Sequence, residues 1–125
     1  IGAFGLAGGG AAGLEVDRAD RSQGTPEHAL VLASSTRHTD IYLMTPEDLL
    51  DPTPDWSGTQ ADIIRADLTF FETAGGGAVF STGSIAWAGS MAWNGYDNEI
   101  ARITTNVLKR FNDPERFELP ELKDS

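Results

Sequence analysis

Three carboxylates near the start of the chain form the densest group of side chains that could do chemistry. Glu15, Asp17 and Asp20 follow directly on the glycine-rich run Gly8–Gly13. Glycines let a ligand or another backbone segment approach closely, and a carboxylate beside them can act as general base or metal ligand. The competing interpretation pairs Asp17 with a nearby arginine and leaves Glu15 in water. Pattern alone favours this second interpretation, because surface carboxylates far outnumber catalytic ones.

The histidines and tryptophans carry weaker signals. His28 and His38 are the only histidines, and they lack both the spacing of a helical metal pair and a cysteine to complete a site. Trp87 and Trp93 could line a pocket, but tryptophans more often bury their large area in a core or an interface. We therefore expect all four residues to be structural.

The segment Ser81–Ser84 lies where a predicted strand meets a predicted helix. In α/β proteins such a junction binds phosphate or carboxylate through backbone N–H groups. The segment lacks the lysine of a phosphate-binding loop, and the chain has no G-x-S-x-G nucleophile motif. Helix capping by Ser84 is the favoured interpretation, and an anion site is the alternative.

The sequence pattern predicts that strands alternate with helices along the chain, and these elements must position the residues above. Leu14–Arg18 predicts a short strand or extended segment with Glu15 and Asp17 on one face. The apolar run over residues 29–33 predicts a strand buried on both faces, and Ile41–Met44 predicts a second strand. We therefore expect an α/β fold with a mainly parallel sheet and flanking helices, similar to flavodoxin.

Further along, one pattern stays ambiguous. The β-rich runs 67–72 and 78–81 are separated by the glycines of 73–77, which predicts either a hairpin or a helix end capped by Gly75 that leads into a strand. A helix after Ser84 would be weakened by Gly89.

The C-terminal part gives the firmest local prediction. Apolar residues recur at steps of three and four behind an Asp97-Asn98 cap, which predicts an amphipathic helix; they are Ile100, Ile103, Val107, Leu108 and Phe111. Thr45–Asp48 predicts a short capped turn that the prolines of 51–55 end. We assign residues 1–112 to one α/β domain and residues 113–125 to an acidic, extended tail.

Composition narrows the possible partners. The 125 residues include 19 acidic and 9 basic side chains, a formal net charge of −10, and no cysteine. This charge disfavours binding to nucleic acid or anionic lipid, and the absence of cysteine excludes disulfides, thiolate nucleophiles and iron–sulfur ligation within the chain. No apolar run approaches the roughly 20 residues of a membrane span. We expect a cytoplasmic protein, and the apolar start suggests a fragment of a longer one.

Several ordered motifs resemble one known family. The stretches 8–18, 24–35 and 76–87, together with Asn94–Asn98 and Asn106–Phe111, are similar to the C-terminal region of the N,N-dimethylformamidase large subunit family. The resemblance covers residues 8–111. It implies the end of a catalytic subunit that hydrolyses a small formamide or related amide to an acid and an amine. It also implies an incomplete domain similar to class I glutamine amidotransferases.

The resemblance further implies a mononuclear iron held by two tyrosines and a glutamate that lie upstream of this chain. Tyr42 and Tyr96 are therefore not expected to be ligands, and these 125 residues alone should be inactive. Glu15, in the Gly13–Arg18 motif, matches the family's catalytic glutamate that does not bind the metal, and is our candidate general base. The implied partners are a small amide substrate, a small subunit and further copies of the parent enzyme. The alternatives are a noncatalytic subunit-packing domain or a stand-alone flavodoxin-like binding module.

Overall fold

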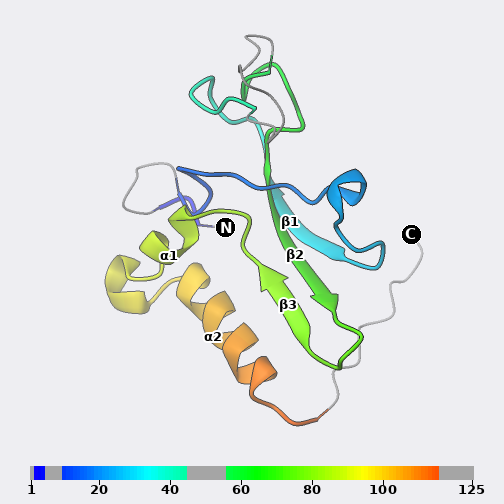
Figure 1. Ribbon diagram of the computed structural model, residues 1–125. Helices are drawn as coiled ribbons and strands as arrows, with labels where there is room; N and C mark the ends of the chain where they lie inside the picture. Colours follow the sequence, from blue (N-terminus) through cyan, green and yellow to red (C-terminus); the bar gives the residue numbers. More distant parts are fainter. Residues whose placement is uncertain (1, 5–9, 45–55, 116–125) are drawn as a thin grey trace, which may run out of the picture.

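The computed structural model describes residues 2–4, 10–44 and 56–115, and every structural statement below concerns these residues. Their elements are the strands β1 (Leu30–Ser35), β2 (Ala66–Glu72) and β3 (Ala78–Ser81), the helices α1 (Ala86–Ser90) and α2 (Glu99–Phe111), and the 3-10 turns η1 (Arg21–Gln23) and η2 (Trp93–Tyr96) (Figure 1).

The sheet is antiparallel, with strand order β1-β2-β3. The β2–β3 connection closes where the N–H of Thr73 donates to the carbonyl of Gly77 at 2.7 Å. Gly76 sits in this turn at φ +85°, a conformation that glycine adopts without strain. The predicted hairpin is therefore confirmed, and the alternative of a helix end capped by Gly75 is wrong.

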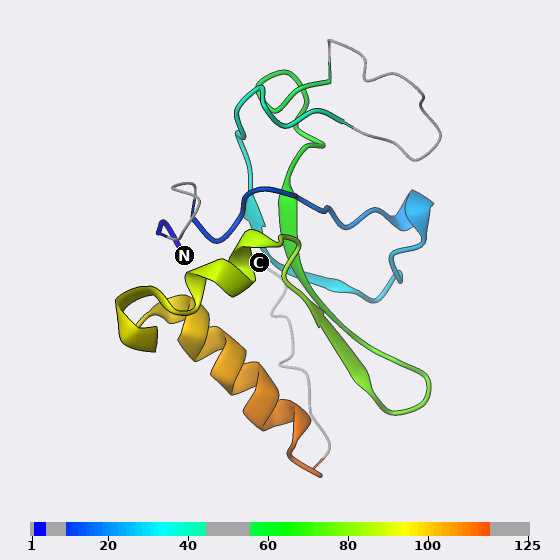
Figure 2. The ribbon, with the colours of Figure 1, turned by 60° about the vertical axis from the view of Figure 1, so that its left-hand side comes forward.

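The prediction of a mainly parallel, flavodoxin-like α/β sheet is wrong. A parallel pair needs a crossover of a dozen or more residues, whereas a five-residue turn joins β2 to β3 and leaves them antiparallel. The prediction of a strand buried on both faces over residues 29–33 is also wrong, because Val31 and Leu32 are each 52% exposed in β1, at the edge of the sheet. Figure 2 shows both helices on one side of the sheet, not on both.

The second predicted strand, Ile41–Met44, also did not form. Only an isolated bridge between Leu43 and Ser57 occurs there. The segment instead belongs to a loop that returns toward the start of the chain.

The core forms where the helices cover one face of the sheet. Its buried residues are Ala11, Leu68, Trp87 and Ile100, and Phe4, Ala33, Phe80, Met91 and Ile103 pack against them. The indole N–H of Trp87 donates to the Thr104 hydroxyl at 3.0 Å, so this tryptophan joins α1 to α2. Trp93 stays 53% exposed and stacks on Phe4.

The C-terminal helix is confirmed. The Asn98 side chain accepts from the N–H of Ala101 at 2.9 Å and caps α2, while Ile100 is fully buried. Helix α1 is only five residues long, and Ile85 occupies its cap position. The Ser84 hydroxyl does accept from the N–H of Ala86, at 3.3 Å, but its shorter hydrogen bonds go elsewhere, as described below.

The N-terminal segment, residues 13–20, crosses one end of the sheet. In Figures 1 and 2 this segment, in blue, crosses the sheet where β1 ends and β2 begins. Backbone hydrogen bonds of 2.9 Å fix the crossing, from Asp17 N–H to Gly83 carbonyl and from Asp67 N–H to Asp17 carbonyl. The segment is therefore held by both β2 and the chain that follows β3.

The Asp67 carboxylate lies fully buried between this segment and the sheet. It accepts from the Ser34 hydroxyl at 2.6 Å, from the Ala19 N–H at 2.9 Å, and from the Arg65 Nε, which reaches both carboxylate oxygens. Because Ala19 belongs to the N-terminal segment, Ser34 to β1 and Asp67 itself to β2, this one group joins the segment to both strands.

Some predictions lie outside the described residues: the capped turn Thr45–Asp48, the stop at 51–55, and the acidic tail beyond residue 115. Within the described part of the chain, no helix is long and apolar enough to cross a membrane.

We predict that Asp67→Ala lowers the free energy of unfolding by roughly 2–4 kcal/mol, because it leaves the Ser34 hydroxyl and the Ala19 N–H without their acceptor and Arg65 without its carboxylate partner. The midpoint of urea unfolding measures the change. As a control, Glu27→Ala removes a carboxylate from an exposed ion pair with Arg21 and should change stability by less than about 0.5 kcal/mol. Equal effects of the two variants would contradict the role given to Asp67.

We predict that Gly83→Ala is also strongly destabilising, by more than roughly 2 kcal/mol. Gly83 has φ +63°, and a Cβ there would lie 2.6 Å from the Asp67 carbonyl oxygen and 2.9 Å from that of Asp17. Gly76→Ala is the matched control, since its φ is +85° but a Cβ would meet nothing within 4 Å. That variant should cost only about 1 kcal/mol in the same unfolding experiment.

Candidate functional site

The backbone immediately before Glu15 makes a tight, strained turn. The Glu15 N–H donates to the Gly13 carbonyl at 2.8 Å, which closes a three-residue γ-turn with Leu14 at its centre. Leu14 has φ +66°, although its side chain is 71% exposed and gains little from packing. A non-glycine residue in this region costs about 1–3 kcal/mol and persists only where the surroundings hold it.

The first group that holds the turn is the buried hydroxyl of Ser84. This oxygen accepts from the Gly13 N–H and donates to the Gly13 carbonyl, both at 2.8 Å. Ser84 is only 7% exposed, so the exchange takes place away from water, where hydrogen bonds are strengthened. Gly13 is thereby fixed to the start of α1.

The second group is Tyr42. Its hydroxyl oxygen accepts from the Leu14 N–H at 3.1 Å, and its ring lies against the ring of His38 at 5.0 Å between centroids. The approach is close, because a Cβ on Gly13 would lie 3.2 Å from the tyrosine oxygen. The turn is therefore hydrogen-bonded on one side to Tyr42, in the loop after β1, and on the other to Ser84, at the start of α1.

The loop that carries Tyr42 is itself well anchored. The Asp40 carboxylate accepts from the Ser57 hydroxyl at 2.5 Å and from both the N–H and the hydroxyl of Thr59. These hydrogen bonds lower the pKa of Asp40 below its ordinary value of 3.8, and the bond from Ser57 has the largest effect. Gly58 lies so close that a Cβ there would be 2.3 Å from the Thr39 carbonyl oxygen.

The three clustered carboxylates have different environments. Asp20 is structural, because it caps η1 through Ser22 and pairs with Arg18 at 2.6 Å, and the Ser22 and Arg18 hydrogen bonds lower its pKa. Glu15 and Asp17 are exposed, and neither carboxylate has a hydrogen bond or ion pair to the described residues. The expected pairing of Asp17 with a nearby arginine is therefore absent from this part of the chain. Glu15 presents an available carboxylate on a rigidly held backbone.

The two histidines bind backbone carbonyls. The Nε2 of His28 lies 2.8 Å from the Glu72 carbonyl oxygen, and that of the buried His38 lies 3.0 Å from the Ser35 carbonyl oxygen. These contacts fix loops against strand ends and agree with the structural role expected for both residues.

The alternative anion site at Ser81–Ser84 has no structural support. Ser84 is buried and its hydroxyl is occupied by Gly13, while the following helix has five residues. The parallel sheet on which such a site depends is absent from the described residues. The flavodoxin-like binding module is therefore set aside.

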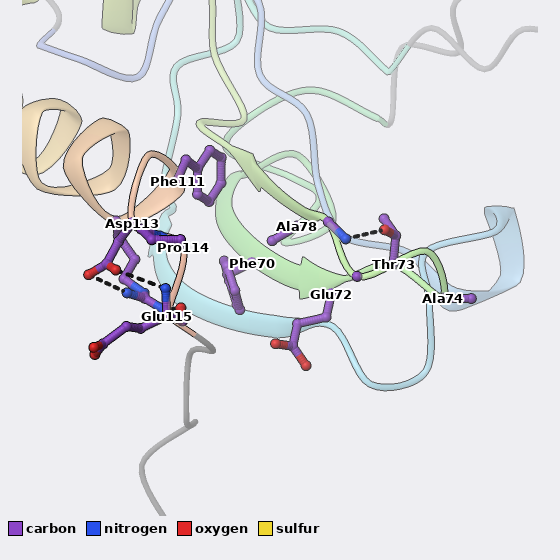
Figure 3. A pocket seen from close by; sticks show the side chains of 12 residues that line it. Phe70, Glu72, Thr73, Ala74, Ala78, Phe111, Asp113, Pro114 and Glu115 are labelled. Carbon is purple, nitrogen blue, oxygen red and sulfur yellow. Dashed lines mark hydrogen bonds and ion pairs between the residues drawn. The ribbon is translucent and has the colours of Figure 1, made fainter.

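Neither of the two best-defined cavities of the described residues is lined by Glu15. The larger, about 700 Å³, lies between the β2–β3 turn and the end of α2, and Figure 3 shows its lining. Arg110 faces it but is bound to Asp113 at 2.8 Å and to the Glu115 carbonyl. The smaller, about 380 Å³, is lined mainly by small residues from 2–3, 11–12, 33–35 and 66.

Comparison with known proteins identifies the family. The family model described as "N,N-dimethylformamidase beta subunit-like, C-terminal" matches residues 1–98. The chain belongs to this family. Among its relatives, the N,N-dimethylformamidase beta subunit of Paracoccus aminophilus is 51% identical over 111 residues, and that of an Alcaligenes species is 49% identical over 111 residues. The match covers 89% of this chain but only 15% of each relative.

Membership in this family confirms that the sequence motifs resemble those of N,N-dimethylformamidase. The relatives are named as the beta subunit, and that name carries neither "large" nor "catalytic", so those parts of the expectation are not supported. A glutamine amidotransferase-like class finds no support either, and the antiparallel sheet contradicts the α/β fold it implied.

The described residues offer no place for the iron that the resemblance implies. Among residues 2–4, 10–44 and 56–115, no three histidine or carboxylate side chains gather closely enough to hold a metal ion. The hydroxyl of Tyr42 is used to hold the Leu14 N–H.

The pattern of residue types did not reveal Tyr42, Ser84 or Asp67 as the groups that hold the Glu15 segment. Tyr42 is 28 positions from Leu14, and Ser84 is 71 positions from Gly13. A single sequence gives no signal of such pairings. The one hint was the glycine-rich approach, which indicated that another part of the chain comes close.

We predict that Asp40→Asn makes acid unfolding less steep. The lowered pKa of Asp40 means that its stabilisation is complete above pH 3.8 and is lost as the pH falls through the lower folded value. Urea midpoints measured at a series of pH values below 3.8 should fall less steeply for the variant than for the parent protein. Identical slopes would show that Asp40 does not hold the loop.

Proposed function

We propose that this chain is the C-terminal segment of an N,N-dimethylformamidase-like amidohydrolase, in which Glu15 is the general base. One observation carries the assignment: an exposed carboxylate, with no partner among the described residues, follows directly on a strained γ-turn that two side-chain hydroxyls hold in place. Backbone strain of this kind concentrates at functional sites, because a fixed geometry is worth its cost there. The family membership supplies the reaction class.

Hydrolysis of an amide gives this carboxylate a defined task. A water attacks the carbonyl carbon while Glu15 takes one of its protons, and a tetrahedral intermediate forms. The same carboxyl group then gives the proton to the amide nitrogen as the carbon–nitrogen bond breaks. The products are a carboxylic acid and an amine, and Glu15 returns to its ionised form.

The other groups of the site are proposed to come from outside this chain. In this proposal the mononuclear iron, its ligands and the substrate-binding walls would lie in the upstream part of the parent protein, which agrees with the exposure of Glu15 and its place outside the two cavities described above. Iron would make a bound water more acidic and so ease its deprotonation. The small amide substrate, the association with a small subunit and with further copies, and the cytoplasmic location are parts of the same proposal.

We predict that Glu15→Gln in the full-length protein lowers kcat by roughly 10²–10⁴-fold, because glutamine keeps the shape but cannot take a proton. Steady-state hydrolysis of N,N-dimethylformamide, followed by dimethylamine release, measures the change. Bound metal, determined by elemental analysis, should stay unchanged, since Glu15 is not a ligand.

Asp17→Asn is the matched control for this experiment. Asp17 lies in the same segment, its exposed carboxylate has no hydrogen bond or ion pair to residues 2–4, 10–44 or 56–115, and its backbone is hydrogen-bonded to Gly83 and Asp67. Its activity should stay close to that of the parent protein. Near-normal turnover of Glu15→Gln would sink the assignment of the base.

A noncatalytic packing role is the second candidate, favoured by the exposure of Trp93 (53%) and Tyr96 (67%) on η2. This role predicts that Trp93→Ala breaks the assembly of the parent enzyme while Glu15→Gln is neutral. Trp87 is unsuitable for that test, because it is buried in the core and its loss would unfold the domain. Native mass spectrometry of the two variants separates the two functions.

A further inference from the structure

We propose that Tyr42 is a positioning residue for Glu15, acting through the single peptide group that joins Gly13 to Leu14. This inference rests on the function proposed above for Glu15. The Leu14 N–H of that peptide donates to the Tyr42 hydroxyl, and the Gly13 carbonyl of the same peptide accepts from the Ser84 hydroxyl. The two side chains therefore hold opposite ends of one rigid plane.

That peptide plane sets the direction in which Glu15 leaves the turn. The strained φ of +66° at Leu14 would relax if the Gly13–Leu14 peptide rotated and returned φ to negative values. Such a rotation would carry the N–H away from Tyr42 and the carbonyl away from Ser84, and would break the 2.8 Å bond to the Glu15 N–H. The γ-turn and the direction of the Glu15 side chain would be lost together.

Tyr42 is placed to hold the N–H end without moving itself. Its ring is half-buried against His38, whose Nε2 is bound to the carbonyl of Ser35 at the end of β1. On the other side, the Asp40 carboxylate and Gly58 fix the loop to residues 57–59. The Tyr42 hydroxyl thus fixes the Leu14 N–H relative to the sheet, while Ser84, at the start of α1, binds the Gly13 carbonyl at the other end of the peptide.

Tyr42→Phe in the full-length protein tests the positioning role, since it removes one oxygen and keeps the ring on His38. We expect kcat to fall roughly 10- to 100-fold, the loss that a small misplacement of a catalytic group causes. KM should stay within about twofold, because substrate binding is not affected. Tyr96→Phe is the matched control: it removes the same atom from a side chain that is 67% exposed and whose hydroxyl has no hydrogen bond among the described residues.

The double variant Glu15→Gln/Tyr42→Phe decides how Tyr42 acts. If Tyr42 works through Glu15, its loss should cost nothing further once Glu15 cannot take a proton, so the double variant should match Glu15→Gln alone. An unchanged kcat for Tyr42→Phe, alongside a large loss for Glu15→Gln, would overturn the positioning role and leave the general base intact. A Tyr42→Phe loss that persists in full in the double variant would also overturn it.

Two further outcomes are decisive. If Glu15→Gln is itself active, the proposed function fails and the positioning role fails with it. If Tyr42→Phe lowers the unfolding temperature by clearly more than 3 °C together with kcat, and Tyr96→Phe changes neither, Tyr42 stabilises the fold as a whole and is not a positioning residue for Glu15. The expected result is an unfolding temperature within about 3 °C of the parent protein for both tyrosine variants.

Discussion

The buried Asp67 carboxylate is the interaction on which the rest of this structure depends. A fully buried charge is tolerated only where hydrogen bonds and an opposite charge compensate its lost hydration. Asp67 finds them in Arg65, in the Ser34 hydroxyl of β1 and in the Ala19 N–H of the N-terminal segment. Its own backbone N–H binds the Asp17 carbonyl as well. A segment with too little apolar surface to pack by itself is in this way fixed across the end of the sheet.

Because residues 17–19 are fixed, the chain before them can adopt a strained backbone conformation, with Leu14 at φ +66°. The Ser84 hydroxyl and the Tyr42 hydroxyl hold the Gly13–Leu14 peptide from α1 and from the loop after β1. The strain at Leu14 is therefore supported by elements 28 and 71 positions away in sequence. This arrangement fixes the backbone from which the exposed Glu15 side chain leaves the surface of the described residues. For a segment that spans about 15% of its relatives' length, an exposed carboxylate suits a site completed by the rest of the parent protein.

The sequence was a good guide where the signal is local. The three- and four-residue spacing from Ile100 to Phe111, with Asn98 as cap, defines α2, and the glycines at 75–77 define the hairpin. The sequence was a poor guide where contacts with distant parts of the chain decide how a segment pairs and how deeply it is buried. Five apolar residues at 29–33 are compatible with a strand buried on both faces, but among the described residues β1 pairs with β2 alone, at the edge of the sheet, and Val31 and Leu32 are exposed. The candidate carboxylate could be named from the motif around Gly13, but the hydroxyls that hold it could not, since no local pattern links Tyr42 or Ser84 to that turn.

The central claim is that the held turn delivers Glu15 to the reacting amide. A crystal structure of the full-length protein with a bound, unreactive amide tests it most directly. The account predicts that the Glu15 carboxylate lies within about 2.6–3.2 Å of the attacking water, or reaches it through one further water, with the γ-turn at Leu14 unchanged. A Glu15 side chain that points into bulk solvent, away from the bound amide, would contradict it.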